Sequence, residues 1–275
     1  MGKKATSGII LVLLTMGMLS LAFNIQPAKA RTITVPDDYP TIQEAVNAAN
    51  EGDTIFVRNG TYYENVVVNK TVWLVGEDKY TTIIDGNSTG NVIVITSNNV
   101  NFTGFTIQHG DNGIYVGTDF FGFCNIYENI VRNNTNGIYL SGSSRNNNVS
   151  YNLITNNQHG IVLSYSGENT LLGNNATSNR YNFEVKGFSF FHLDNNVDTS
   201  NTVDGKPIYY LIAVSNAILG AESNAGTVFL INCQNITVKD LTLTKKWSRG
   251  FSLEHYKLQN RKCHRHKKSL WSFSW

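Results

Sequence analysis

A four-residue pattern that recurs along the middle of the chain limits its fold more than any other feature. A glycine, an apolar residue, a variable residue and a second apolar residue occur at Gly113–Val116, Gly137–Leu140 and Gly160–Leu163, a step of about 23 residues. Asn182–Val185 continues the series one step later. Periods of this length are typical of solenoids, in which each repeat packs only against its neighbours. The sequence therefore predicts one stack of short coils.

Alternation within each unit separates an inward set of side chains from an outward set. Successive side chains of a β-strand point to opposite faces, so the two apolar positions of a unit share one face. We expect six residues to stack inside the coils: Ile114, Ile138, Ile161, Val116, Leu140 and Leu163. Tyr115 and Tyr139 then occupy the same outward position on neighbouring coils, followed by Val162 and Glu184.

An asparagine stands eight residues before three of the units, at Asn129, Asn152 and Asn174, and Phe105 has the equivalent place in the earliest coil. Repeated asparagine at one turn predicts a ladder of side-chain amides along the stack. Asparagine also tolerates the left-handed backbone of tight turns. A propeller would need roughly twice this period, and leucine-rich repeats need a leucine framework that the chain lacks. The pattern favours an all-β protein, a right-handed single-stranded parallel β-helix.

The first 30 residues have the three parts of a secretory signal peptide. Lys3 and Lys4 give a positive start, an apolar run covers Ile9–Phe23, and Ala28-Lys29-Ala30 is a small-x-small cleavage site. The alternative is a retained membrane anchor, but the run is shorter than the roughly 20 residues that span a bilayer. We predict cleavage after Ala30, a mature chain that does not span a membrane, and an extracellular, periplasmic or cell-surface location.

Residues 31–90 are predicted to form an N-terminal cap and the first coils. Tyr39-Pro40-Thr41 opens a helix with proline at an early position, and Gly52 closes it. One apolar stripe of this amphipathic helix contains Ile42, Ala45, Val46 and Ala49. Strands are expected at Thr54–Val57, Asn65–Val68 and Val72–Val75, separated by turns at Asn59–Gly60 and Asn69–Lys70. Because the end of a coil stack is apolar, we expect the helix to cover it.

Charge and cysteine content restrict the partners. Residues 31–244 hold 10 of the 22 basic and 19 of the 20 acidic residues, a net charge of −9. Nucleic acid needs a basic face for its phosphates, so we exclude it as a partner. Cys124, Cys233 and Cys263 have no metal-ligand spacing. An exported protein could join two of them, and the spacing does not show which.

Two segments resemble known families. Thr32–Asp85 resembles the N-terminal part of pectin-methylesterase-like and other pectin-lyase-like β-helix proteins, in the words YPTIQEAVNAANEGDTIFVRNGTYYENV and TIIDG. The later coils are similar to the NosD-like β-helix family, named for a periplasmic copper-binding accessory protein, most particularly at Asp198–Tyr210 and Cys233–Val238. Together the resemblance covers about Thr32–Thr244. It implies the fold, carries no catalytic residues, and implies little about function because the family includes many uncharacterised surface proteins.

The repeats are predicted to occupy residues 91–246, and an irregular basic tail, residues 247–275, follows them. Cys263-His264-Arg265-His266 in this tail could be a metal tract or a solvated basic segment. A third interpretation is a single-base shift near Trp247–Arg249, because synonymous codons for His255–Trp275 permit the coil-like string TTNSKIENVTATKNHYGLFL in another frame. We expect this tail to be out of frame and disordered.

Catalysis on this fold would need clustered carboxylates, and glycoside hydrolysis needs two that lie about 5–10 Å apart. The acids considered fall at unmatched repeat positions: Asp111, Asp119, Glu128, Glu168, Glu184 and Asp194. Asp194 and Asp198 flank a turn and could bind a cation, but capping of that turn is the simpler interpretation. Asp204-Gly205-Lys206-Pro207 is also predicted to be a turn. We therefore predict no catalytic residues.

Metal ligands are equally scattered. Softer copper sites use Cys or Met, and cupric sites use His. Residues 31–275 contain no methionine, and His109, His159 and His192 share no repeat position, so each is expected to be an isolated surface residue. We predict no metal site and no cofactor, because the residues support neither copper nor calcium.

Tyr115 and Tyr139 are the candidate ligand face, because aromatic rows can stack on sugar rings, although they could simply cover the strands. The leading hypothesis is an exported, non-catalytic carbohydrate-binding or cell-surface module whose partner is a polysaccharide or surface glycan. One alternative is a polysaccharide lyase, epimerase or esterase whose catalytic coils are missing from this chain. The other is a copper-binding accessory protein.

Overall fold

The computed structural model describes residues 29–117, 122–142, 144–243 and 270–273. The chain divides into two compact units, Met1–Ala30 and Arg31–Trp275, and the elements described below belong to the second. Apart from its last two residues, the predicted signal peptide lies outside the described residues. Within the described ranges, no helix has the length and apolar character needed to cross a membrane.

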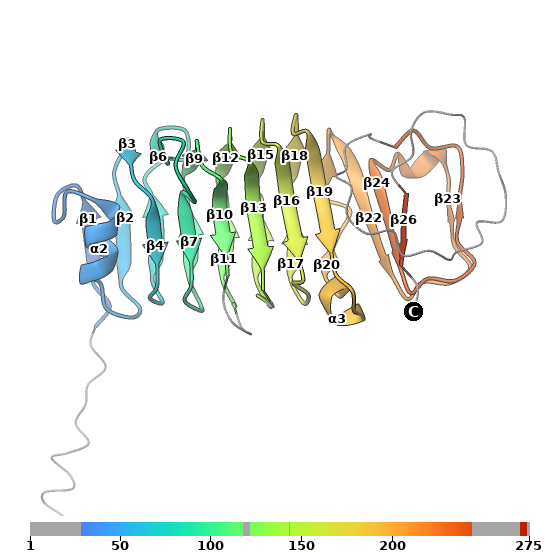
Figure 1. The fold of residues 1–275 in the computed structure, drawn as a ribbon, viewed down its shortest axis with the longest axis horizontal. Helices are drawn as coiled ribbons and strands as arrows, with labels where there is room; N and C mark the ends of the chain where they lie inside the picture. Colours follow the sequence, from blue (N-terminus) through green and yellow to red (C-terminus); the bar gives the residue numbers. More distant parts are fainter. Residues whose placement is uncertain (1–28, 118–121, 143, 244–269, 274–275) are drawn as a thin grey trace, which may run out of the picture. The chain divides into compact units, whose positions relative to one another are not determined.

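The second unit is a parallel β-solenoid built on three long sheets (Figure 1), which confirms the predicted β-helix. The eight-stranded sheet contains β1 (Thr32–Val35), β2 (Thr54–Val57), β5 (Trp73–Gly76), β8 (Asn101–Thr103), β11 (Asn125–Tyr127), β14 (Asn148–Ser150), β17 (Thr170–Leu172) and β20 (Asn196–Val197). The six-stranded sheet contains β4 (Val66–Val68), β7 (Ile93–Ile95), β10 (Asn112–Val116), β13 (Asn136–Ser141), β16 (His159–Ser164) and β19 (Tyr181–Lys186).

The ten-stranded sheet completes the coils. It contains β3 (Gly60–Tyr63), β6 (Thr82–Asp85), β9 (Thr106–Gln108), β12 (Ile130–Arg132), β15 (Leu153–Thr155), β18 (Asn175–Thr177), β21 (Thr202–Val203), β22 (Lys206–Ile212), β24 (Thr227–Ile231) and β26 (Leu270–Phe273). From β2 to β19 the chain visits the three sheets in the same order on every coil. The sequence pattern had revealed only two of these three strands. The predicted turn at Asn59–Gly60 was wrong in part, because Gly60 begins β3.

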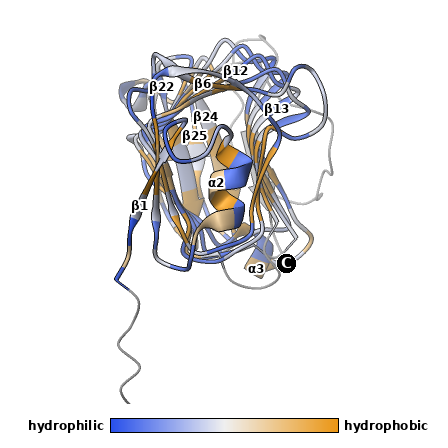
Figure 2. Ribbon diagram, turned by 90° about the vertical axis from the view of Figure 1, so that its left-hand side faces the viewer, coloured by the Kyte–Doolittle hydropathy of each residue, from blue (hydrophilic) through white to orange (hydrophobic). Residues whose placement is uncertain are grey.

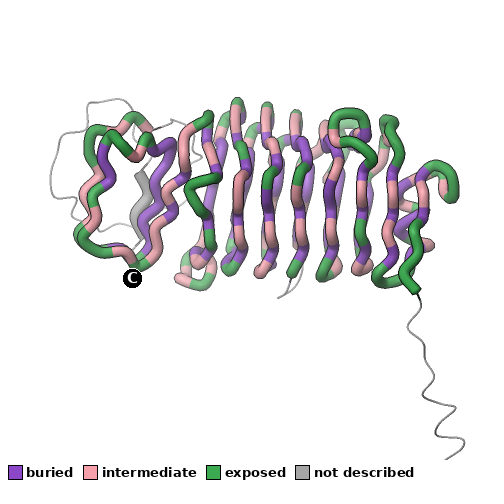
Figure 3. Tube along the Cα trace, turned by 180° about the vertical axis from the view of Figure 1, so that it is seen from behind, coloured by how far each residue is buried: buried purple, intermediate pink, exposed green. Residues whose placement is uncertain are grey.

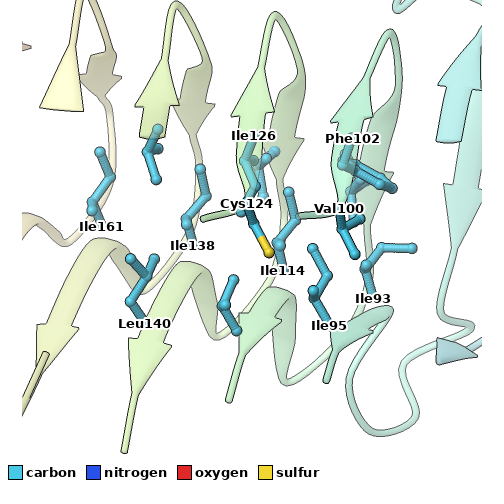
Figure 4. Close-up of a cluster of buried hydrophobic side chains, with 14 of the residues drawn as sticks. Ile93, Ile95, Val100, Phe102, Ile114, Cys124, Ile126, Ile138, Leu140 and Ile161 are labelled. Carbon is cyan, nitrogen blue, oxygen red and sulfur yellow. The ribbon is translucent and has the colours of Figure 1, made fainter. Parts of the chain in front are cut away.

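The six predicted inward residues lie in register inside the coils. Ile138 pairs with Ile114 and Ile161, and Leu140 pairs with Val116 and Leu163. All six are at most 1% exposed. Figure 4 shows part of this interior, where side chains from successive coils meet in one continuous core. Figure 3 shows the alternation of buried and exposed residues along each coil. Apolar burial on this scale is the dominant force that holds such a stack together.

Asparagine ladders fill the corners. Asn129 donates through Nδ2 to Asn152 Oδ1 (3.1 Å), and Asn152 donates in the same way to Asn174 Oδ1 (3.0 Å). Each of the three is 1% exposed. Two further ladders at the other corners were not predicted: Asn134, Asn157 and Asn179, and Asn147, Asn169 and Asn195. A buried amide must be hydrogen-bonded, and stacking equal amides achieves this on every coil.

The left-handed backbone does not fall on the ladder residues, which corrects that part of the prediction. It falls on the residue before each of them: Glu128, Tyr151 and Gly173 have φ of 54°, 54° and 63°. The same order holds at the second corner, where Asn133 (φ 56°) precedes Asn134 and Asn156 (φ 57°) precedes Asn157. The left-handed residue turns the chain, and the next residue then directs its amide into the corner.

The predicted cap helix is confirmed as α2 (Ile42–Ala48), which Figure 2 shows lying across the end of the coils. Thr41 is its N-cap and accepts from Glu44 N (3.1 Å) through Oγ1, so Pro40 lies before the helix, not within it. The helix ends at Ala48, several residues before Gly52, which has φ of 86° in the following turn. The apolar stripe is buried against the first coils.

The last described coils depart from the repeat. Asp204 and Gly205 have φ of 48° and 78° and join β21 to β22 as an antiparallel hairpin, so the predicted turn is confirmed there, while Lys206 and Pro207 begin β22. Every residue of β24 is buried, because the strand contributes to the main core and to a second core. Three short elements accompany it: η1 (Ala221–Ser223), β23 (Ile218–Leu219) and β25 (Thr237–Val238).

The predicted tail lies mostly outside the described residues. Of residues 247–275, the structure describes Leu270–Phe273, which form β26 parallel to β24. The frameshift, the disorder and the Cys263–His266 tract therefore stay predictions. Cys124 and Cys233 are both free thiols, buried in the interior. Burial raises the pKa of the Cys124 thiol to about 11, which makes it unreactive at neutral pH.

Candidate functional site

The outer face of the six-stranded sheet carries the two predicted aromatic residues. Tyr115 on β10 pairs in register with Tyr139 on β13, and their rings stack with centroids 5.9 Å apart and planes 16° apart. Both are half-buried. Both point outward because they alternate with the inward apolar residues of their strands. Gly137, near the start of β13, leaves room for the next coil, since a Cβ there would lie 2.6 Å from the Gly160 carbonyl oxygen.

The outward row changes chemistry as it continues along the solenoid. Val162 on β16 follows Tyr139, and Glu184 on β19 follows Val162, each in register with its neighbour. Val94 on β7 precedes Tyr115. The row therefore runs from aliphatic through aromatic to acidic.

Glu184 is the centre of a charged cluster on β16 and β19. Its Oε1 is hydrogen-bonded to Nδ1 of His159, and its Oε2 lies 3.5 Å from Nζ of Lys186. The side chains of His159 and Glu184 are 16% and 6% exposed. A buried carboxylate must be paired, and here a histidine and a lysine pair it. Glu184 thus holds the His159 ring and the Lys186 ammonium group at the surface.

Aromatic rings extend this cluster. The ring of Tyr181 lies 5.0 Å from that of His159, and the Arg180 guanidinium lies 5.3 Å from the centroid of the Tyr181 ring. The cation–π contact fixes Arg180 beside the strand. The cluster therefore consists of Glu184, the two side chains that contact it, His159 and Lys186, and the neighbouring pair of Tyr181 and Arg180.

An irregular corner follows β19 immediately. The segment between β19 and β20 contains the short helix α3 (Phe190–Leu193), which Figure 1 shows at the end of the β19 arrow. Phe188 and Phe191 are 70% and 73% exposed. The rings of Tyr165, Phe188 and His192 lie within 5.5 Å of one another. Burial and the nearby Arg145 lower the pKa of His192, which favours the neutral ring.

A second acid–histidine pair lies on the outer face of the ten-stranded sheet. Asp85 Oδ2 accepts from Gln108 Nε2 (2.8 Å) and is hydrogen-bonded to His109 Nδ1 (2.9 Å). Arg132 Nε in turn donates to Gln108 Oε1 (2.9 Å). Burial raises the pKa of Asp85, but the hydrogen bonds from Gln108, Asn87 N and His109 outweigh it and leave the pKa lowered. Asp85 is therefore a stably ionised, fully hydrogen-bonded carboxylate, as expected for a structural pair.

The structure brings together few of the remaining acids considered. Glu128 and Glu168 are left-handed corner residues, and Glu168 forms an ion pair with Arg145 (3.7 Å). Asp198 Oδ1 accepts from Ser200 N (3.2 Å), as expected for turn capping. Asp194 is the C-cap of α3, Asp111 is exposed, and Asp119 lies outside the described residues. Within the described ranges, no three His, Cys, Asp or Glu residues are placed to hold a metal ion.

Sequence reasoning missed both acid–histidine pairs. His109 and His159 were expected to be isolated surface residues, which was wrong because each meets a carboxylate. The separations, 24 residues for Asp85 and His109 and 25 for His159 and Glu184, are close to one coil. Neither histidine is in register with its acid, because His159 pairs with Tyr181 and Asp85 pairs with Gln108, so repeat positions gave no signal for either contact.

Comparison with known proteins found one named relative and several solved structures. A chain named "Cell surface glycoprotein" from Methanothermus fervidus is 31% identical over 126 residues, 45% of this chain and 21% of that protein. This chain therefore spans about a fifth of the length of that relative. Two solved structures are also similar to this chain. An alginate lyase from Paenibacillus sp. has a TM-score of 0.48 at 12% identity, covering 77% of this chain and 75% of that chain. A pectin methylesterase from carrot has a TM-score of 0.37 at 14% identity, covering 78% and 89%.

One family model also matches. It is described as "Periplasmic copper-binding protein (NosD)" and covers residues 46–219, from within α2 to β23. The match includes every coil on which the outward row and the asparagine ladders lie. Because it extends over more than half of the sequence, the chain belongs to the NosD family of parallel β-helix proteins.

Proposed function

We propose that this protein is an exported, non-catalytic module that binds a polysaccharide or surface glycan on the outer face of the six-stranded sheet. The observation that carries the proposal is the stacked pair Tyr115 and Tyr139, whose rings repeat along the solenoid axis. Aromatic faces contact the apolar faces of sugar rings, and a row of them suits a chain of sugars. A linear ligand would then lie along the axis, across the strands.

The charged cluster supplies the polar contacts that such a ligand needs. Lys186 and Arg180 can donate to sugar oxygens at the surface, beside the Tyr181 ring. Glu184 itself is too buried to make a broad contact, so its role is to position His159 and Lys186. A mostly apolar platform with a few placed polar groups is the usual composition of a small-ligand site.

Two kinds of observation support export. The first residues have the composition of a signal peptide, and the family description and the name of the Methanothermus relative both refer to places outside the cytoplasm. A surface location would present the solenoid to extracellular glycans.

A glycan array followed by titration calorimetry tests the proposal. The double variant Tyr115→Ala/Tyr139→Ala should weaken binding of the best glycan at least about tenfold, because it removes both platform rings. Tyr63→Ala is the matched control, since Tyr63 is 71% exposed on the ten-stranded sheet and should not affect affinity. Binding that is equal in the double variant and the wild type would contradict the proposed face, and the absence of any glycan ligand would contradict the proposed function.

The second candidate function is a polysaccharide lyase, epimerase or esterase. The observation that favours it is the hydrogen bond between His159 and Glu184, because a histidine oriented by a carboxylate is a common general base. Incubation with pectin, alginate and their methyl esters, followed by assays for unsaturated products, epimerised residues and released methanol, tests it. Activity that is lost in His159→Gln would favour the enzyme over the binding module.

The family description names copper, and the described residues do not fit it. Cys124 and Cys233 point into the core, residues 31–275 contain no methionine, and His109 and His159 each use Nδ1 on a carboxylate. Copper sites use several Cys, Met or His ligands together, and calcium sites need clustered oxygen ligands. No such group exists among the described residues. The Cys263–His266 tract lies outside them.

A further inference from the structure

The first residue after the predicted cleavage site is fixed tightly to the cap. Arg31 is also the first residue of the second compact unit. Its carbonyl oxygen accepts from Thr54 N (2.9 Å), which sets it in register with β2. Its backbone nitrogen donates to Asp53 Oδ1 (2.9 Å). The position of the Arg31 nitrogen is therefore determined by the sheet and by one carboxylate.

Asp53 is a buried and ionised partner. Its side chain is 3% exposed, and its Oδ2 accepts from Arg31 Nε (3.1 Å) and Asn50 N (2.8 Å). Burial raises the pKa of Asp53, but the hydrogen bonds from Arg31 N, Asn50 N and the guanidinium together outweigh it and leave the pKa lowered. The carboxylate is thus built to carry a negative charge beside the Arg31 nitrogen.

Arg31 also reaches the cap helix. Its guanidinium donates through Nη2 to the carbonyl oxygen of Ala48 (2.7 Å), the last residue of α2. A cation at this end favours the helix, because the last carbonyls are otherwise unpaired and carry partial negative charge. One residue therefore joins β1, the turn before β2 and the end of α2.

We propose that hydrolysis of the Ala30–Arg31 peptide bond completes the cap, because it turns a neutral donor to Asp53 into a charged one. Water adds across the bond, Ala30 leaves with a carboxylate, and Arg31 keeps an α-ammonium group at the position of the former amide. An ionised donor forms a stronger hydrogen bond to a carboxylate than a neutral amide does. The mature protein is then more stable than the precursor, and processing at this site makes folding outside the cytoplasm more favourable.

Three proteins with different first residues test the proposal: one that begins at Arg31, one that begins at Ala30, and one that begins at N-acetylated Arg31. The last two keep the hydrogen bond to Asp53 and lack the charge at the Arg31 nitrogen. We expect the free Arg31 protein to melt about 3–6 °C above both in low salt. Equal melting temperatures for the Arg31 and Ala30 proteins would overturn the proposal.

Asp53→Asn identifies the partner of the charge. In this background the differences among the three proteins should disappear, and persistence of the full differences would show that Asp53 is not the partner. If the variant fails to fold, the comparison of the unsubstituted proteins still decides the question. Mass spectrometry of the exported full-length product should give Arg31 as its first residue, and a different first residue would contradict processing at this bond.

Discussion

Two rows of side chains run along the same coils with the same spacing and opposite character. Inside one corner, Asn129, Asn152 and Asn174 repeat the same residue and the same hydrogen bond. On the outer face of the six-stranded sheet, the row changes from tyrosine through valine to Glu184. Each buried amide in this row is hydrogen-bonded by the next coil, so asparagine repeats from Asn129 to Asn174, whereas the apolar Phe105 has the equivalent place in an earlier coil. The outer row has no such requirement, so its residue type can change from coil to coil, and the proposed glycan-binding face lies on it.

The same contrast distinguishes the two acid–histidine pairs. Asp85 continues into a row of polar side chains through Gln108 and Arg132, so its charge is absorbed by a hydrogen-bonded surface. Glu184 interrupts an apolar and aromatic row, where valine precedes it. Of the two pairs, His159 and Glu184 are therefore the better candidate for a functional site, because a buried acid in an otherwise apolar row is not needed to build the coils.

Breaking the inner row should have the largest effect. Asn152→Ala removes the acceptor of the Asn129 main-chain N–H and the donor to the Ile126 carbonyl oxygen. It also removes one of the three acceptors of the Asn129 side-chain amide, which keeps Phe102 O and Tyr127 O. We expect the free energy of unfolding to fall by about 2–4 kcal/mol, because these groups stay buried. Asn175→Ala, at an exposed position nearby, should change it by less than about 0.5 kcal/mol. Urea denaturation of both variants checks this, and equal effects would remove the distinction between the rows.

Replacing His159 and Glu184 with the residues of the preceding coils should change the free energy of unfolding less, and in the opposite direction. His159→Asn/Glu184→Val returns the two positions to the residues that occupy them at Asn136 and Val162. Replacing a largely buried acid–histidine pair with residues that fit is commonly neutral or stabilising, so we expect no loss and a gain of up to about 2 kcal/mol. Glycan affinity should fall. A loss of more than about 1 kcal/mol in thermal or urea denaturation would assign the pair a structural role.

The smallest expected effect is on the pH dependence of stability. It distinguishes a row that contains an ionised acid from a row of amides. The folded-state pKa of Asp85 is lowered, so its contribution to stability is present above the unfolded-state pKa of about 3.9 and is lost as the pH falls through the folded-state pKa. Asp85→Asn should therefore flatten the acid side of the stability curve. Asn152→Ala should lower the curve equally at every pH, since amides do not titrate. Stability measured by urea denaturation from pH 2 to 7 would reveal a failure of either expectation.

Much of the fold could be predicted because its rules are local and repeated. The Ile114–Ile138–Ile161 stack follows from alternation within a strand and a fixed step between coils, and the ladder at Asn129 follows from the same step. The third strand of each coil, such as β12 or β15, was missed because it is only three residues long and lacks the glycine-led unit that marks the strands of the six-stranded sheet. The cap helix was predicted, but its start was placed too early, at Tyr39–Thr41. The helix begins at Ile42 because the Thr41 side chain caps it, and Pro40 had suggested an earlier first turn.

The candidate site could be predicted only in its aromatic half. Tyr115 and Tyr139 share a repeat position, so the repeat alone was enough to predict that they are neighbours on one face. The contact between His159 and Glu184 emerged only from the folded chain, because His159 is in register with Tyr181 and reaches Glu184 diagonally across β16 and β19. Only the tertiary structure likewise showed that Asp53 receives the Arg31 nitrogen. Periodicity determines which residues share a row, whereas contacts between rows depend on how the whole stack packs.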